Sequence, residues 1–359
     1  MNLKGGKLAA KHKMKKLSFL FLISIFLHTG NSQAQDVHFS QLYETPLFLS
    51  PANTGFFNGY VRAIGNYRSQ WAAMNNAFQT MGFSLDGGMF KSKRRPVFMG
   101  LGLTVLNDRA GVANLRNTSV MLHMSGIVKM NKKSALSAGV SGGAVSSNAD
   151  FTKLTYESQF NGNTLDPAVN SGESPYRQYS TVDVNAGVAY EFTSYKIDSD
   201  HDDITNFRVS LGVFHLNRPA QEFGLGSDYR LPMRWTGAVT SVLDIKDTKF
   251  TVNPAVVYHR QGSYSELLMG SYIKVRMSTG TKVTGEKTQN AIGFGLFYRN
   301  KDAVIPKLIF DLGDFSIGMA YDVNISAYRV ASRGRGGFEV SLRYNDLASS
   351  LFDSRKEYR

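Results

Sequence analysis

A stretch near the C-terminus reads Gly337-Phe338-Glu339-Val340-Ser341-Leu342-Arg343-Tyr344. Its apolar and aromatic side chains alternate strictly with small or charged ones. Because successive side chains of a strand point to opposite faces, this period of two predicts a β-strand with one apolar and one polar face. A transmembrane barrel needs this division, with lipid outside, a polar lumen inside and aromatic residues near the strand ends.

The same alternation recurs from about residue 61 onward, for example in 182–190, 292–298 and 315–322. In these segments Tyr or Phe lies near the end of the apolar face, and the other face carries small or polar residues. Turns rich in Asn, Gly, Asp, Ser and Lys separate the segments. The expected strands are 61–68, 79–89, 97–107, 118–129, 134–145, 178–190, 207–216, 232–244, 249–259, 264–275, 290–300, 304–312, 314–323 and 336–344.

This pattern predicts an all-β fold, a transmembrane antiparallel β-barrel of about 14 strands, within a range of about 12 to 16. A soluble β-rich protein is the alternative, but its polar face would favour Lys, Glu and Thr. Here the second face is rich in Gly and other small residues, which suits a crowded or narrow lumen. We expect the barrel over 59–345 and a C-terminal tail over 346–359.

The N-terminus has the features of a signal peptide over 1–34. Six lysines precede an apolar run from Leu17 to Leu27, and Ser32-Gln33-Ala34 places small residues where a signal peptidase reads them. We expect cleavage before Gln35. An uncleaved anchor is the alternative, but the run is much shorter than the roughly 20 residues of a membrane helix. Because the chain contains no Cys, it has no lipoprotein signal, disulfide or thiolate metal site.

The charge balance argues against nucleic acid as a partner. The formal net charge is +13, but six of the 41 basic residues and none of the 28 acidic ones lie in 1–34. The remainder is mildly basic, without a basic helix or an aromatic-basic module. After Leu27 no apolar stretch has the length of a membrane helix, and the mean hydropathy is −0.22. Outer-membrane lipid, with its anionic head groups, is the better partner for a basic rim.

The connections follow the expected topology with two exceptions. If both ends of the barrel chain lie in the periplasm, 130–133, 245–248 and 313–314 become tight periplasmic turns. The connections 191–206 and 277–289 fall on the same side and are longer than such turns should be.

A segment without strand alternation precedes the barrel. Residues 35–58 contain Pro46 and Pro51, and we expect an ordered N-terminal periplasmic extension or plug, packed at or inside the periplasmic mouth. Together with the two long connections, this segment is a candidate surface for periplasmic partners.

We find no set of residues that calls for catalysis or metal binding. No histidine beyond 34 has a metal-binding spacing, and no Gly-x-Ser-x-Gly elbow or phosphate-binding loop occurs. The acidic stretch 198–203 lacks the Gly and distal Glu of an EF-hand, which favours a solvated loop. Glycine pairs such as Gly100-Leu101-Gly102 lie within strands and indicate tight packing there. We expect no enzymatic activity, no cofactor and no bound metal.

Several motifs resemble the PorP/SprF family of type IX secretion proteins. That family opens with Phe-x-Gln, then Asn-Pro-Ala-x-x-Gly, then Tyr-Arg-x-Gln-Trp, and Ser50 stands where the first Asn is usual. The corresponding stretches are Phe39-Ser40-Gln41, Ser50-Pro51-Ala52-Asn53-Thr54-Gly55, Tyr67-Arg68-Ser69-Gln70-Trp71, Asn107-Asp108-Arg109-Ala110-Gly111, Gly318 to Ser326 and Gly336 to Leu342. The centre of the chain, about 146–290, carries less of the signature.

The resemblance implies an accessory barrel of the type IX secretion system in the outer membrane of a Gram-negative bacterium. It implies support for secretion or cell-surface attachment of a partner adhesin, linked to gliding in some relatives. The implied partners are periplasmic components of the secretion machinery and a large secreted surface protein. The resemblance agrees with the expected absence of enzymatic activity. A diffusion porin or solute channel is the alternative function.

The motif residues have either structural or partner-binding roles. Pro51 and Gly55 are expected to fix a turn, by a locked φ and by tolerance of positive φ. Trp71 suits an interfacial anchor, and Arg68 a pairing with a lumen carboxylate, Glu339 or Asp322. The full set of candidate residues is Phe39, Gln41, Pro51, Asn53, Gly55, Arg68, Gln70 and Trp71.

Overall fold

The computed structural model describes most of the chain, and all statements below concern the residues it describes. These are 36–71, 78–91, 96–150, 154–162, 164–166, 168–172, 178–197, 202–221, 229–246, 248–277, 290–327 and 329–346. The expected signal peptide, the C-terminal tail beyond Asp346 and residues 278–289 lie outside them.

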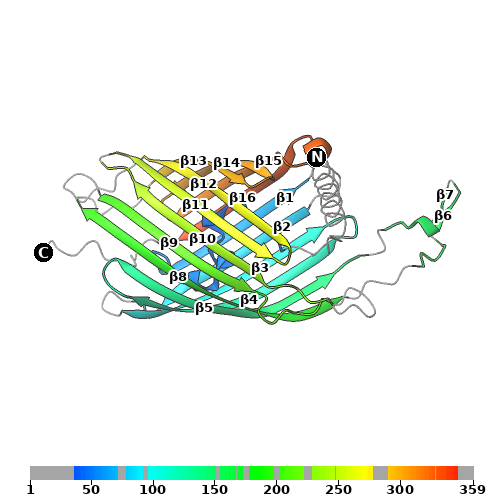
Figure 1. Cartoon of the computed structure of the whole chain (residues 1–359), viewed down its shortest axis with the longest axis horizontal. Coiled ribbons are helices and arrows are strands. Elements are labelled where there is room, and N and C mark those ends of the chain that lie inside the picture. Colours follow the sequence, from blue (N-terminus) through cyan, green and yellow to red (C-terminus); the bar gives the residue numbers. More distant parts are fainter. Residues whose placement is uncertain are drawn as a thin grey trace, which may run out of the picture. The chain divides into compact units, whose positions relative to one another are not determined.

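Fourteen antiparallel strands form one closed barrel (Figure 1). Each strand pairs with its neighbours in chain order, and β1 closes the ring by pairing with β16. The strands are β1 (Val61–Gln70), β2 (Phe78–Met89), β3 (Val97–Ala110), β4 (Leu115–Lys129), β5 (Ser134–Asn148), β8 (Tyr179–Ile197), β9 (Asp202–Phe214), β10 (Arg234–Asp244), β11 (Phe250–Gln261), β12 (Tyr264–Arg276), β13 (Asn290–Arg299), β14 (Ala303–Leu312), β15 (Phe315–Asn324) and β16 (Arg335–Asn345). The predicted fold class and strand count are confirmed.

The barrel has two ends, which we name by their connections. At the turn end, β1 begins, β16 finishes and tight turns such as 313–314 join the strands. At the loop end, the long connection 149–178 joins β5 to β8 and contains a small separate sheet, β6 (Phe160–Asn161) with β7 (Thr164–Leu165), to the right in Figure 1. Outer-membrane barrels keep periplasmic turns short and extracellular loops long. The turn end is therefore the periplasmic end.

The two faces of the wall divide as the alternation predicts. On β16, Phe338 and Leu342 are exposed on the outside, whereas Glu339 and Ser341 are buried in the lumen. Asp322 on β15 is buried on the same inner face. Large apolar side chains are exposed on the outer surface of the barrel strands, as contact with lipid requires.

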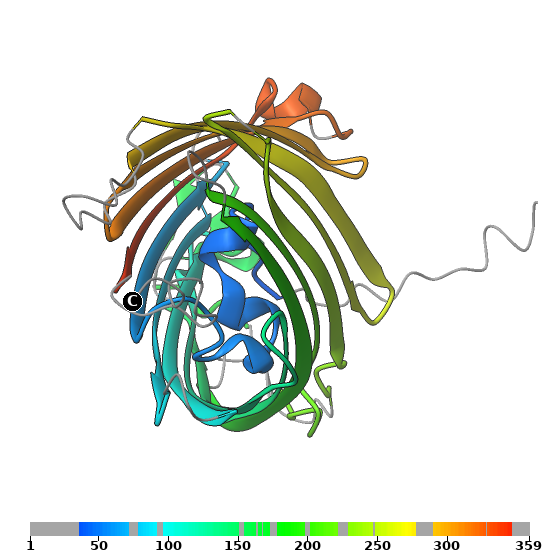
Figure 2. The same cartoon turned by 90° about the vertical axis from the view of Figure 1, so that its left-hand side faces the viewer.

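Residues 36–58 lie inside the barrel (Figure 2). They form three short helical turns, η1 (Leu42–Glu44), α2 (Pro46–Leu49) and η2 (Pro51–Asn53). The backbone N–H and C=O groups of the barrel wall form hydrogen bonds between neighbouring strands. The backbone groups of this segment therefore need other hydrogen-bond partners, and side chains that line the lumen provide them. We call residues 36–58 the plug segment.

The plug segment crosses the lumen from one end to the other. Asp36 contacts Arg234 and Gln261, which lie at the loop end of β10 and β11. At its other end, the Asn345 side chain donates a hydrogen bond of 3.0 Å to the carbonyl oxygen of Asn58, at the turn end. Of the two forms that the sequence analysis left open, a periplasmic extension or a plug, the segment has the form of a plug, and it extends beyond the periplasmic mouth.

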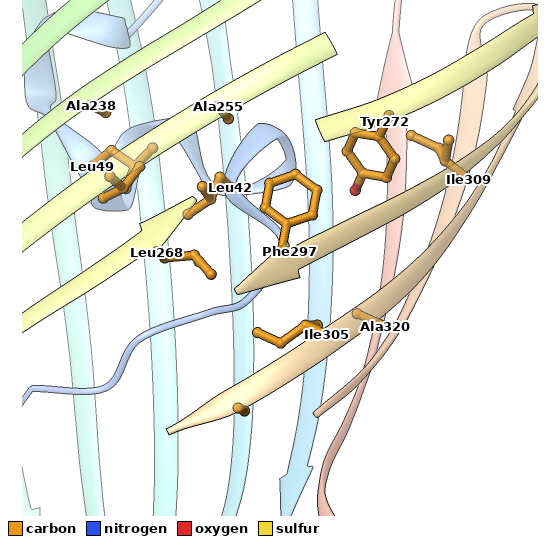
Figure 3. Close-up of a cluster of buried hydrophobic side chains, with 12 residues drawn as sticks. Leu42, Leu49, Ala238, Ala255, Leu268, Tyr272, Phe297, Ile305, Ile309 and Ala320 are labelled. Carbon is orange, nitrogen blue, oxygen red and sulfur yellow. The ribbon is translucent and has the colours of Figure 1, made fainter. Parts of the chain in front are cut away.

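Apolar side chains of the plug segment complete a core inside the lumen. Leu42 and Leu49 pack with Tyr272 and Phe297 of the wall and with further small and aliphatic side chains of β10–β15 (Figure 3). Tyr43 lies beside this cluster, and its ring centre is 5.8 Å from that of Tyr272. Removing such area from water stabilises the seated segment by about 25 cal/mol per Å².

The prediction of a long connection over 191–206 is wrong. Strands β8 and β9 extend through 191–197 and 202–206, and their ladder continues to the pair Ile197 with Asp202. Only 198–201 remain between them, and these residues lie outside the described part of the chain, so the solvated loop predicted for 198–203 is mostly untested. The extensions escaped notice because β8 carries Glu191 and Thr193 on its inner face and no apolar alternation there.

Within the described residues, no helix is both long and apolar enough to span a membrane.

Candidate functional site: the plugged lumen

A row of small residues crosses five strands of the wall. In the strand register, Gly212 pairs with Gly187, which in turn pairs with Gly139. The row continues through Ser125 to Gly100. These residues come from β9, β8, β5, β4 and β3, so they are far apart in sequence and meet only through the register of the barrel. We call them the glycine row.

Residues 49–55 of the plug segment lie along the glycine row. A Cβ atom added to Gly100 would lie 2.1 Å from the carbonyl oxygen of Thr54, and one on Gly139 would lie 2.5 Å from that of Pro51. At Gly212 the corresponding distance to the carbonyl oxygen of Leu49 is 2.5 Å. Because real Cβ atoms do not approach so closely, these glycines leave the space that the segment occupies.

Hydroxyl groups of the wall bind the carbonyl groups that the plug segment presents. Ser125 and Ser137 each donate a hydrogen bond of 2.6 Å, to Thr54 and Ala52 respectively. The Ser50 hydroxyl donates one of 2.9 Å to the carbonyl oxygen of Leu211 in the wall. Small residues thus supply both room and hydrogen-bond partners on this side of the lumen.

A buried charged cluster holds the first part of the plug segment. The Glu339 carboxylate accepts hydrogen bonds from the backbone N–H groups of Ser40 (2.7 Å) and Gln41 (3.0 Å). Asp322 accepts one from the Ser40 hydroxyl (2.9 Å) and pairs with Arg68 (3.0 Å) and Arg299 (2.9 Å). Buried charges persist only when they are paired and hydrogen-bonded. The predicted pairing of Arg68 with a lumen carboxylate is confirmed.

Lys307 and Arg343 extend this cluster toward the turn end. The Lys307 ammonium donates a hydrogen bond to the carbonyl oxygen of Ser40 and lies 3.6 Å from the centre of the Phe297 ring. Arg343 pairs at 3.0 Å with Glu44 of the plug segment. Lys307 and Arg343 thus tie two points of the segment, Ser40 and Glu44, to β14 and β16.

A third set of contacts anchors the segment at the loop end. Asp36 lies 2.6 Å from Nε2 of His215 and 3.2 Å from Arg234, and Asp183 lies 3.0 Å from Nδ1 of His215. Burial lowers the pKa of His215, but the two carboxylates outweigh this and raise it to about 9. Burial raises the pKa of Asp36, but His215 and Arg234 outweigh this and hold it well below its usual range.

At the turn end, a polar contact fixes the turn before β1. Asp86 accepts a hydrogen bond of 2.7 Å from the backbone N–H of Gly55 and pairs at 2.8 Å with Arg62. Arg62 also donates to the carbonyl oxygen of Asn53, at 3.1 Å. Gly55 has a φ of 64°, which favours glycine, and a Cβ there would lie 2.7 Å from Gly100.

The structure brings six of the eight candidate residues together in the lumen. Phe39 packs near Gly82 of β2 and against the ring of Phe48, and the Gln41 side chain accepts a hydrogen bond of 2.8 Å from Ser341. Asn53 donates to Pro46 within the segment, at 2.9 Å. Pro51 and Gly55 form the turn over the glycine row, and Arg68 reaches the segment from β1.

The other two candidates lie at the loop end of β1. Gln70 is the last residue of the strand, and Trp71 follows it with a φ of 54° and its ring against Phe78. The sequence analysis missed Ser40, Glu44, Arg299 and Lys307 as parts of the site, and it interpreted the glycines as strand packing. Alternation alone assigned the inner face but gave no indication of what lay against it.

The described residues contain no group of His, Cys, Asp or Glu that could hold a metal ion. The contacts that the cluster in the lumen makes are the charge pairs and hydrogen bonds that hold the plug segment.

Comparison with solved structures finds other β-barrels at low similarity. The toluene transporter TbuX of Ralstonia pickettii has 10% sequence identity and a TM-score of 0.44, over 84% of this chain and 93% of that one. BamA of Haemophilus ducreyi, lacking POTRA domains 1–3, has 8% identity and a TM-score of 0.42, over 80% and 70%. The P. putida toluene transporter TodX has 9% identity and a TM-score of 0.40, over 83% and 92%.

No curated protein matches the sequence. The family model of the type IX secretion system membrane protein PorP/SprF matches residues 31–344, which include the plug segment and nearly the whole barrel. A closed barrel with an apolar outer surface is the form in which a protein crosses the outer membrane. The chain therefore belongs to the PorP/SprF family of type IX secretion system membrane proteins, and it lies in the outer membrane of a Gram-negative bacterium.

Proposed function

We propose that this protein is a plugged barrel that supports secretion or cell-surface attachment of a partner adhesin by the type IX secretion system, without enzymatic activity of its own. Family membership supports a role in that system. The filled lumen supports a role in docking over a role in diffusion.

The plug segment is the observation that carries this proposal. Along 39–57 nearly every side chain is buried, and the segment is bound to the wall by Glu339, Asp322 and Lys307. A diffusion porin needs a water-filled lumen. Here residues of the same chain occupy the lumen. A diffusing solute would have to displace the plug segment from all its contacts with the wall. The porin alternative therefore has less support.

The accessible ends of the barrel are the surfaces left for partners. Because the plug segment is buried, we withdraw it as a direct docking surface. The connection 277–289 at the turn end, of which residues 278–289 lie outside the described part of the chain, remains a candidate for contact with periplasmic machinery. The long connection 149–178 at the loop end faces the cell surface, where an adhesin would be held.

Two measurements test the proposal. The purified barrel in a planar lipid bilayer should show no steady conductance, and a strain that lacks the protein should accumulate the adhesin without displaying it. Steady conductance by the unaltered barrel, with normal display in the deletion strain, would establish the porin alternative instead.

Shortened connections then separate the two ends. Replacing 278–289 by a tight turn should leave the amount of barrel in the outer membrane unchanged and reduce adhesin display. The matched control shortens 154–172 at the loop end. Loss of display in only the second variant would place the essential contact on the cell surface rather than in the periplasm.

A further inference from the structure

A shallow pocket of about 500 Å³ lies on the outside of the wall at the loop end. Its lining comes from the connection after β9, the start of β10 and the turn between β11 and β12. The lining residues are Arg218, Pro232, Met233, Trp235, Arg260 and Gly262. None of them takes part in the plugged lumen.

The strand register places this pocket on the lipid-facing surface. Trp235 pairs with Arg260, and both side chains are exposed on the outer face. The next outward pair in the same two strands is Gly237 with Tyr258, followed by Val239 with Val256. The pocket therefore opens onto an apolar strip that runs toward the middle of the membrane.

Two guanidinium groups border the pocket. Arg218 is exposed in a tight turn, in which its backbone N–H donates a hydrogen bond to the carbonyl oxygen of His215. Arg260 is exposed at the end of β11. Among the described residues, neither guanidinium has a carboxylate partner, unlike the paired arginines of the lumen. An outward arginine is strongly unfavourable at the bilayer midplane and nearly neutral at the interface. These positions therefore suit the interface, where anionic groups are available.

We propose that this pocket binds the phosphate-bearing head group of an anionic outer-leaflet lipid. The leaflet follows from the topology, because the loop end is the extracellular end. Guanidinium groups bind phosphate in a bidentate manner. Trp235 lies at the level of the head groups, where aromatic side chains anchor barrels. The acyl chain runs along Tyr258 and Val256.

The test measures retention of diphosphoryl lipid A by the purified full-length barrel, with native mass spectrometry. Phosphatidylcholine is the zwitterionic comparison, because its phosphate is balanced by a quaternary ammonium group and it has no net charge. The variant Arg218→Gln with Arg260→Gln should bind lipid A roughly tenfold more weakly, which corresponds to about 1.4 kcal/mol. Arg116→Gln is the matched control, because Arg116 is an exposed arginine at the loop end of β4, away from the pocket. It should change binding by less than about twofold.

Further variants identify the ligand. Trp235→Ala should weaken lipid A binding, and excess inorganic phosphate should fail to displace the lipid. Heat-modifiable migration on gels verifies that each variant is folded. The variant Arg218→Lys with Arg260→Lys should bind at a level between the unaltered protein and the double Gln variant, because Lys keeps the charge but not the bidentate geometry. Unchanged binding in the double Gln variant, or an equal loss in Arg116→Gln, would overturn the proposal. Displacement by phosphate together with an unaffected Trp235→Ala variant would show a free-anion site, which also overturns it.

Discussion

The carboxylate of Glu339, on the strand that closes the barrel, accepts a hydrogen bond of 2.7 Å from the backbone N–H of Ser40. These two residues are separated by almost the whole length of the chain. Their contact joins the plug segment to the seam between β1 and β16. The stability of the closed barrel and the seating of the plug segment are thus coupled through one side chain.

Replacing Glu339 with Ala should destabilise the barrel by about 3–5 kcal/mol. The change leaves the N–H groups of Ser40 and Gln41 without their acceptor and removes a carboxylate that lies 4.0 Å from Nε of the buried Arg68. The temperature at which the folded form disappears on gels should fall accordingly. Glu339→Gln keeps an acceptor for the N–H groups of Ser40 and Gln41 and should be affected less. Equal stability of the Ala variant and the unaltered protein would mean that Glu339 does not hold the segment.

Filling the glycine row should displace the plug segment and open the lumen. In Gly139→Leu the new side chain would occupy the position of the Pro51 carbonyl group, which lies 2.5 Å from an added Cβ. We expect a conductance in planar bilayers that the unaltered barrel lacks. Gly126→Leu is the control, since a Cβ there meets nothing within 4 Å. A silent Gly139→Leu barrel, folded by the gel assay, would contradict this account of the row.

The anchor at the loop end should weaken at high pH. The pKa of His215 is raised to about 9 in the folded protein, so the stability it contributes is complete below about 6.5 and is lost as the pH rises through 9. The loss is at most about 3 kcal/mol. Asp36, with its lowered pKa, keeps its contribution except in strong acid. The temperature of thermal unfolding should be lower at pH 10 than at pH 7, and His215→Gln should reduce this difference.

Charges on the outer face of β16 should stop membrane insertion. Leu342 is 52% exposed, and Val340 lies on the same face. Each buried charge costs up to a few kcal/mol in lipid, so Val340→Asp with Leu342→Asp should leave no heat-modifiable form. Ser316→Asp, on the inner face beside Arg343, is the matched control and should still insert. A folded form of the double variant would show that this face does not contact lipid.

The barrel was predictable from sequence because its signal is local. Alternation along Phe338 to Tyr344 is set by the pleat of one strand, and the same holds for each of the other strands. The long connection at 191–206 was mispredicted for the same reason, since polar pairs such as Ser194 with Thr205 and Thr193 with Asn206 interrupt the apolar alternation there. Neither of its faces carries a run of apolar residues that would reveal the strand.

The site in the lumen was less accessible to sequence reasoning. The polar inner face was predicted, and so was the pairing of Arg68 with a lumen carboxylate. The glycine row depends on the relative register of five strands, which no short stretch encodes. Nothing in the local sequence marks Ser40 or Lys307 as part of a site. Only the fold places the carbonyl oxygen of Ser40 within reach of the Lys307 ammonium group.

The path of the plug segment also constrains how the protein is made. A chain that passes through a ring has to be threaded into it or enclosed by it. With Asp36 at one opening, Asn58 at the other and the wall continuous between β1 and β16, enclosure needs only that one seam form late. In this order of assembly, the sheet first curves around the plug segment. Strands β1 and β16 then pair last, after Ser40 has bound Glu339.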